Sequence, residues 1–141
     1  MGDVKLAEGV YWVGAVDWDI PASSGYTGTS YNAYLIVDEK VTLVDGVKHS
    51  HQDQLWENIR KIIDPEKIDY MIVNHVEPDH SSSMPDIMET IKPEKLFCTS
   101  AGQKALIAHF HREDWPYELV KTGDEISLGA RTVHFITTRM L

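Results

Sequence analysis

The sequence is 141 residues long, with 43% hydrophobic and 25% charged residues and a formal net charge of -9. Its length is that of about one domain, and its composition is typical of a globular protein rather than a disordered one. The acidic excess disfavours nucleic acid and anionic membrane surfaces as partners, because their phosphates would be repelled. No apolar run approaches the roughly 18 residues of a membrane span, and no signal peptide begins the chain, so we expect a cytoplasmic protein.

The first half of the sequence is rich in β-branched and aromatic residues and predicts strands. We expect these strands at residues 10–13, 31–37 and 41–44, with a polar turn that makes a hairpin of the last two. The small polar residues 25–30 predict a loop.

The second half predicts helices alternating with strands. Apolar residues recur at helical spacing over 52–63, and Pro65 ends that helix. The continuous apolar run 70–73 is typical of a central strand that is covered on both faces. Further helices are expected at 84–90 and 102–110, and further strands at 95–99, 117–121 and 132–137. This order predicts a layered α/β or α+β fold with helices packed on a sheet.

A single cysteine, Cys98, excludes an internal disulfide, a Cys-rich zinc module and a Cys-ligated iron–sulfur cluster. It lies in the strand predicted at 95–99, where we expect a buried and inert thiol. The four tryptophans, at positions 12, 18, 56 and 115, are expected in core or interface packing rather than in flavin stacking.

Four candidate metal ligands follow the buried strand: His75, Glu77, Asp79 and His80. The carboxyl ends of strands are where α/β sheets commonly place their sites. In an extended loop His75 and Glu77 would point the same way, and Pro78 would restrict the turn that sends the other two elsewhere. This spacing suits two adjacent metals, and imidazole with carboxylate suits iron, zinc or manganese. The alternative is a solvated loop of surface residues.

Two other histidines, His49 and His51, form a His-x-His pair after the strand at 41–44. They are possible metal ligands, but the helix that begins just after them favours a solvated loop.

The motif His-x-Glu-x-Asp-His after a strand is similar to the metal motif of the metallo-β-lactamase superfamily, whose hydrolases carry histidine at the third motif position. Flavodiiron proteins carry glutamate there, as this sequence does at Glu77. Residues 9–14, 29–35, 121–123 and 138–141 also look like that family, in the same order. The whole chain therefore resembles the flavodiiron proteins, which are also called rubredoxin:oxygen oxidoreductases or A-type flavoproteins.

The resemblance implies a metallo-β-lactamase-like αββα sandwich. Residues 1–141 would be the N-terminal portion of this diiron domain, about its first half, and the FMN-binding flavodoxin-like domain would lie outside the chain. His75 and Glu77 would bind one iron, and Asp79 and His80 would face the second. His80 is displaced from the metal by water in some members. Asp45 is either a turn residue or an acid that orients the ligand loop.

Two departures from the family are visible. Members often have a histidine before the Gly-Tyr pair near the iron pocket, where this sequence has Ser24 before Gly25 and Tyr26, so proton delivery or substrate preference is expected to differ. The family's remaining ligands, two histidines and a bridging aspartate, follow the Arg-Met-Leu that ends at Leu141. The chain alone therefore cannot complete the site, and we expect either a piece of a longer polypeptide or a truncated form.

The implied function is an oxidoreductase that reduces oxygen to water and/or nitric oxide to nitrous oxide at two irons, with electrons from FMN. The family also implies a rubredoxin-like electron donor and a homodimer or homotetramer. Glu77 agrees with redox chemistry, because an added negative charge favours the higher oxidation state of a metal. One alternative is a zinc hydrolase of the same superfamily. The other is an incomplete fragment that self-associates through exposed apolar strands.

Overall fold

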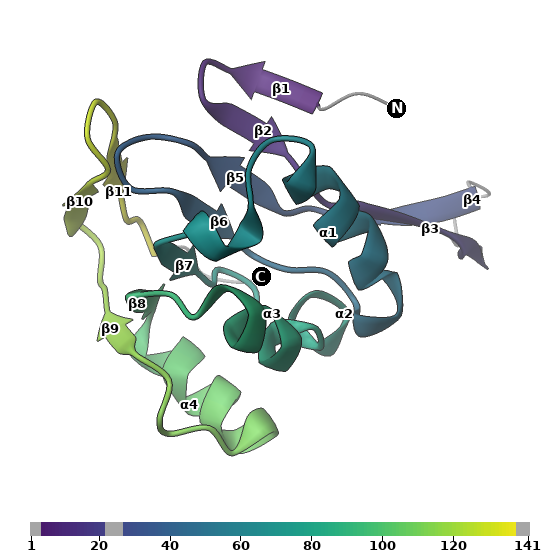
Figure 1. The fold of residues 1–141 in the computed structure, drawn as a ribbon. Coiled ribbons are helices and arrows are strands. Elements are labelled where there is room, and N and C mark those ends of the chain that lie inside the picture. Colours follow the sequence, from purple (N-terminus) through teal and green to yellow (C-terminus); the bar gives the residue numbers. More distant parts are fainter. Residues whose placement is uncertain (1–3, 22–26, 138–141) are drawn as a thin grey trace.

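In the computed structural model, the described residues are 4–21 and 27–137. Their largest element is a seven-stranded sheet with the order β1-β2-β5-β6-β7-β8-β9 (Figure 1). Its strands are β1 (Val4–Ala7), β2 (Val10–Trp12), β5 (Tyr34–Ile36), β6 (Thr42–Val44), β7 (Tyr70–Ile72), β8 (Lys95–Cys98) and β9 (Tyr117–Leu119). The pairs from β1 to β6 are antiparallel and those from β6 to β9 are parallel, so the sheet is mixed.

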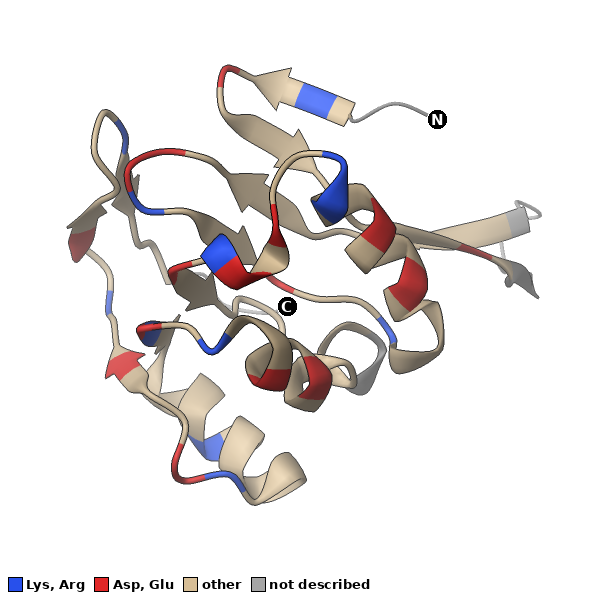
Figure 2. Cartoon of the chain, in the orientation of Figure 1, with Lys and Arg blue, Asp and Glu red and all other residues tan. Residues whose placement is uncertain are grey.

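The helices follow the parallel strands. They are α1 (Gln52–Arg60), α2 (Pro78–Ser81), α3 (Met84–Ile91) and α4 (Ser100–Phe110), with short 3-10 helices η1 (His49–His51) and η2 (Pro65–Lys67). Leu55 and Ile59 of α1 and Ile87 of α3 have no exposed surface and join Met71 of β7 in one core. Acidic positions, coloured red, occur along α1 and α3 (Figure 2). Among the described residues no helix is long and apolar enough to cross a membrane.

Two hairpins complete the described fold. β3 (Ala15–Pro21) pairs with β4 (Thr27–Tyr31), and β10 (Glu125–Ser127) pairs with β11 (Thr132–His134), both antiparallel. The second hairpin lies beside the turn between β5 and β6, where the Lys40 amide donates to the Leu128 carbonyl at 2.9 Å.

The predicted α/β class is confirmed, but some local predictions are wrong. Residues 27–30 belong to β4 rather than to a loop, because their backbone pairs with β3. The strand predicted at 31–37 is interrupted at Ala33, whose carbonyl accepts from the Val13 amide. Residues 78–81 form α2 rather than an extended loop, since proline suits the first turn of a helix. Trp18 was expected in core or interface packing; it is 70% exposed and so lies outside the core, and interface packing stays a prediction.

Candidate metal centre

The loop that carries the predicted ligands, residues 74–83, is held at its start by Asp45. Asp45 directly follows β6, and its Oδ1 accepts hydrogen bonds from the backbone N–H groups of Asn74, at 2.7 Å, and His75, at 3.2 Å. The Asp45 amide itself donates to the Ile72 carbonyl at 2.8 Å. The parallel pairing of β6 with β7 makes these contacts possible, because it brings their carboxyl ends together.

The backbone of Asp45 is in the left-handed region, with φ of 62°, a conformation that aspartate adopts more readily than most residues. Burial raises the pKa of its carboxyl above the ordinary value, and the hydrogen bonds from Asn74 and His75 act in the opposite direction. Asp45 is half-buried, and its side chain accepts from the start of the ligand loop, so its main contacts hold that loop.

The same segment holds the far end of the ligand loop. Ser83 is fully buried, and its hydroxyl donates to the Val47 carbonyl at 2.6 Å and accepts from the Val47 amide at 3.3 Å. A Cβ on Gly46 would lie 3.0 Å from Ser83 Oγ and 3.2 Å from the His80 carbonyl oxygen. Residues 45–47 therefore fix both ends of the loop, and glycine at 46 allows the loop its close approach.

Three of the predicted ligands lie in neighbouring positions on this loop, in two contacting pairs. His75 Nε2 lies 3.4 Å from Glu77 Oε2, and the rings of His75 and His80 meet edge to face with centroids 4.6 Å apart. The turn that brings them together begins at Glu77, whose carbonyl accepts from the amides of His80 and Ser81. The side chains of His75 and Glu77 are 35% and 57% exposed, so both remain open to a ligand.

The structure does not describe the side chains of the other predicted site residues. Asp79 lies in α2, and its side chain is outside the described part of the structure. Ser24 and Tyr26 lie outside the described residues altogether. Within the described ranges, no three His, Cys, Asp or Glu side chains converge on one point as a complete metal site. The donor set nevertheless fits a first-row metal, because imidazole and carboxylate lie together on a loop that the half-buried Asp45 anchors.

A cluster that the sequence did not predict lies beside His80. Asp17 of β3 is 2% exposed, and Tyr31 of β4 donates its hydroxyl hydrogen to Asp17 Oδ2 at 3.0 Å. His51 Nε2 lies 3.5 Å from Asp17 Oδ1. The solvated loop predicted for the His-x-His pair fits His49, with 64% of its side chain exposed, but is wrong for His51, with 19%.

A hollow of about 900 Å³ opens on the face of the sheet opposite α1 and α3. Val44, Ile72 and Phe97 line it from the sheet, and residues 133–137 line it from the other side. His75 and Glu77 lie on its wall, so the candidate ligands border a mostly apolar space. Cys98 also borders the hollow, and burial raises the pKa of its thiol to about 11, as expected of an inert cysteine.

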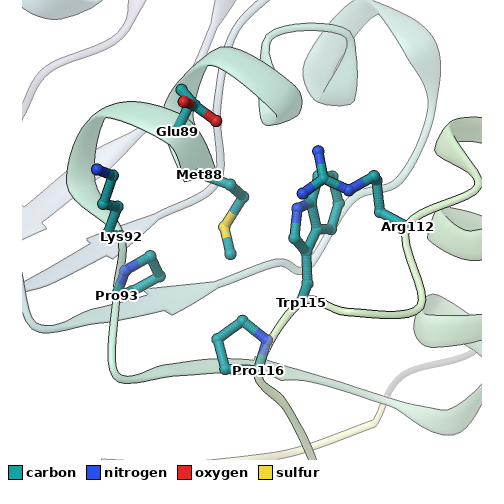
Figure 3. A pocket seen from close by; sticks show the side chains of 7 residues that line it. All are labelled: Met88, Glu89, Lys92, Pro93, Arg112, Trp115 and Pro116. Atoms are coloured by element: carbon teal, nitrogen blue, oxygen red, sulfur yellow. The ribbon is translucent and has the colours of Figure 1, made fainter.

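A smaller cavity, of about 250 Å³, lies between α3 and the segment that leads into β9 (Figure 3). Arg112 lies over the ring of Trp115 at 5.5 Å and makes two hydrogen bonds to Asp114. This cavity shares no residue with the ligand loop, and its Arg112 is already paired.

The mixed sheet and the His-Glu loop at the end of β7 together define a metallo-β-lactamase-like domain. The family model described as "ODP family beta lactamase" matches residues 29–141, and the chain belongs to this family. Within it, the chain is 48% identical to the rubredoxin-oxygen oxidoreductase of Megalodesulfovibrio gigas, over all of this chain and 36% of that protein. It is 46% identical to the nitric oxide reductase of Moorella thermoacetica, over 98% of this chain and 36% of the relative.

Solved structures agree. The rubredoxin oxygen:oxidoreductase of Desulfovibrio gigas matches with a TM-score of 0.90 and 47% identity, over 99% of this chain and 36% of that one. The flavodiiron protein of Giardia intestinalis matches with a TM-score of 0.84 and 33% identity, over 94% and 33%. The predicted relationship to the flavodiiron proteins is thereby confirmed. The chain spans about a third of the length of these relatives.

Proposed function

We propose that residues 1–141 form the N-terminal portion of the diiron domain of a flavodiiron oxidoreductase. The whole protein would reduce oxygen to water and/or nitric oxide to nitrous oxide. The observation that carries the proposal is the placement of His75 and Glu77 at 3.4 Å on a loop that Asp45 anchors. The names of the relatives, an oxygen oxidoreductase and a nitric oxide reductase, support the same reaction class.

Each candidate ligand has a separate role in this proposal. His75 and Glu77 hold one iron, and Asp79 and His80 face the second. Bound iron supplies the site for the small substrate and for electron transfer. Glu77 contributes negative charge that a histidine would not, which favours a redox metal over hydrolytic zinc. Asp45 keeps the His75 backbone in place, so that its imidazole is oriented before metal binds.

The remaining parts of the proposal concern the rest of the protein. FMN would occupy a flavodoxin-like domain outside residues 1–141, a rubredoxin-like protein would donate electrons, and the protein would assemble as a homodimer or homotetramer. The further ligands and the covering layer of the sandwich would come from chain beyond Leu141. The cytoplasmic location stays a prediction.

Of the two alternatives, the zinc hydrolase is disfavoured by Glu77. Self-association of the isolated chain is supported by a specific observation, since apolar side chains remain exposed near the edge of the sheet, among them Leu119 of the edge strand β9, at 49%. Ile136, which lines the hollow, is 75% exposed.

The reaction is tested by following oxygen and nitric oxide consumption by the full-length protein after its flavin is reduced. Glu77→Gln should abolish most turnover, because a neutral amide is a poor ligand for iron. Glu94→Gln is the matched control, since Glu94 is an exposed acid that pairs with Lys40 away from the loop. Undiminished turnover in Glu77→Gln, or hydrolysis of a β-lactam or thioester by a zinc-loaded protein, would contradict the proposal.

A further inference from the structure

The residues Asp17, Tyr31 and His51, here called the Asp17 cluster, come from three elements that the sequence separates. Asp17 lies in β3, Tyr31 ends β4, and His51 ends η1. The Asp17 carboxylate receives the Tyr31 hydroxyl hydrogen at 3.0 Å on one oxygen and has His51 Nε2 at 3.5 Å from the other. His51 Nδ1 in turn lies 2.8 Å from Ser50 Oγ at the surface.

This arrangement holds the ring of Tyr31 in one place. A carboxylate that is 2% exposed is costly unless it is hydrogen-bonded, so Asp17 holds the Tyr31 hydroxyl strongly. Tyr31 is also 2% exposed, which leaves its ring no free space, and its hydroxyl is tied to Asp17. The ring of His51 packs against that of Tyr31 at 5.8 Å from a third side.

The fixed ring of Tyr31 meets the imidazole of His80. The two centroids are 5.6 Å apart and the planes are at 82°, an edge-to-face pair of the kind that aromatic rings prefer. His80 also meets His75, again edge to face, at 4.6 Å and 81°. The imidazole of His80 is thus bounded by one ring from the Asp17 cluster and one from the ligand loop.

We propose that Tyr31, held by Asp17 and His51, is a positioning residue that sets the orientation of the His80 imidazole and thereby its fitness as a ligand of the second metal. This inference rests on the proposed function, which supplies the second metal. The contact between the Tyr31 and His80 rings is present without a metal. The orientation matters because the two nitrogens of a histidine are distinct, and a metal takes only the one that faces it. Loss of the cluster would therefore affect His80. Binding of the first metal by His75 and Glu77, on the loop that Asp45 anchors, would be unaffected.

Three variants of the full-length protein separate positioning from simple packing. Tyr31→Leu removes the ring, whereas Tyr31→Phe and Asp17→Asn keep the ring and weaken its attachment. Tyr34→Leu is the matched control, because it removes a ring of equal size from the neighbouring β5. The two readouts are the imidazole resonances of His80 in metal-free protein with ¹⁵N-labelled histidine, and the affinities for the first and second ferrous ion under anaerobic conditions.

We expect Tyr31→Leu to shift the His80 resonances and to lower the affinity for the second ferrous ion about tenfold, as is usual when a residue that supports a ligand is lost. The affinity for the first ferrous ion should change little. Tyr31→Phe and Asp17→Asn should move the same resonances by less, and Tyr34→Leu should not move them. If Tyr31→Leu does not fold, the two ring-preserving variants decide. Unchanged His80 resonances in both variants would overturn the inference.

The outcomes also separate this inference from the proposed function. Two ferrous ions in the wild type with equal second-ion affinity in every Tyr31 variant would overturn the positioning role and leave the diiron proposal standing. A wild type that binds no iron while Tyr31→Phe still shifts His80 would refute the diiron proposal and support the orienting contact.

Discussion

Replacement of Asp45 tests how the ligand loop is held. Asp45→Ala removes the acceptor of two backbone N–H groups, those of Asn74 and His75, and places alanine at a φ of 62°. Hydrogen bonds to a charged acceptor contribute about 1.5–3 kcal/mol each, and the left-handed backbone adds about 1 kcal/mol for alanine. Because water would partly replace the lost acceptor, we expect the free energy of local opening of the loop to fall by about 3 kcal/mol. Asp45→Asn keeps an acceptor oxygen and tolerates the backbone, so it should cost about 1 kcal/mol.

The assay is amide hydrogen exchange at Asn74 and His75 in the metal-free protein. A loss of about 3 kcal/mol corresponds to exchange that is roughly a hundredfold faster. Asp64→Ala is the matched control, because the Asp64 side chain also accepts from a backbone amide, that of Glu66, but outside the loop. Equal protection of Asn74 and His75 in wild type and Asp45→Ala would refute the anchoring role.

Three further predictions follow from the site and the hollow. Glu77→His in the full-length protein should lower reductase turnover more than iron content, because histidine can still bind metal but lacks the carboxylate charge; unchanged turnover would contradict the redox role of Glu77. Because burial raises the pKa of the Cys98 thiol from about 9 to about 11, the folded state favours the neutral thiol, and its contribution to stability should be complete below pH 9 and lost as the pH rises toward 11. Alkylation of folded protein by iodoacetamide at pH 8 should therefore be far slower than that of unfolded protein, and equal rates would refute this. The isolated 141-residue chain should self-associate in light scattering through exposed apolar side chains such as Leu119 and Ile136, whereas a stable monomer would count against this.

Periodicity predicted the regular elements that pack on the core. The helix expected at 52–63 is α1, because burial of one face of a helix gives apolar residues at helical spacing. The apolar run at 70–73 is β7, because burial of both faces of a strand gives a continuous apolar run. The β3–β4 hairpin has no such hydrophobic pattern in its sequence. Its residues mix charged, small and exposed aromatic side chains, and its pairing depends on backbone hydrogen bonds that any residue can make.

The ligand loop was predictable because its side chains are close in sequence, and their order within one motif carried the family resemblance. Asp45 was ambiguous, since its contact with Asn74 joins residues 29 positions apart. The Asp17 cluster could not be predicted from the sequence, because Asp17 and Tyr31 belong to the unpredicted hairpin. His51 meets Asp17 through the packing of η1 and α1 against β3, which joins residues 34 positions apart.

The central claim is that this loop holds half of a two-iron site. The most direct test is metal analysis, together with the intact mass, of protein purified under anaerobic conditions. The account predicts about two irons per chain at a mass well above 16.0 kDa, as expected if residues 1–141 belong to a longer polypeptide. Stoichiometric zinc in that protein, or a full-length protein that binds no iron, would contradict it.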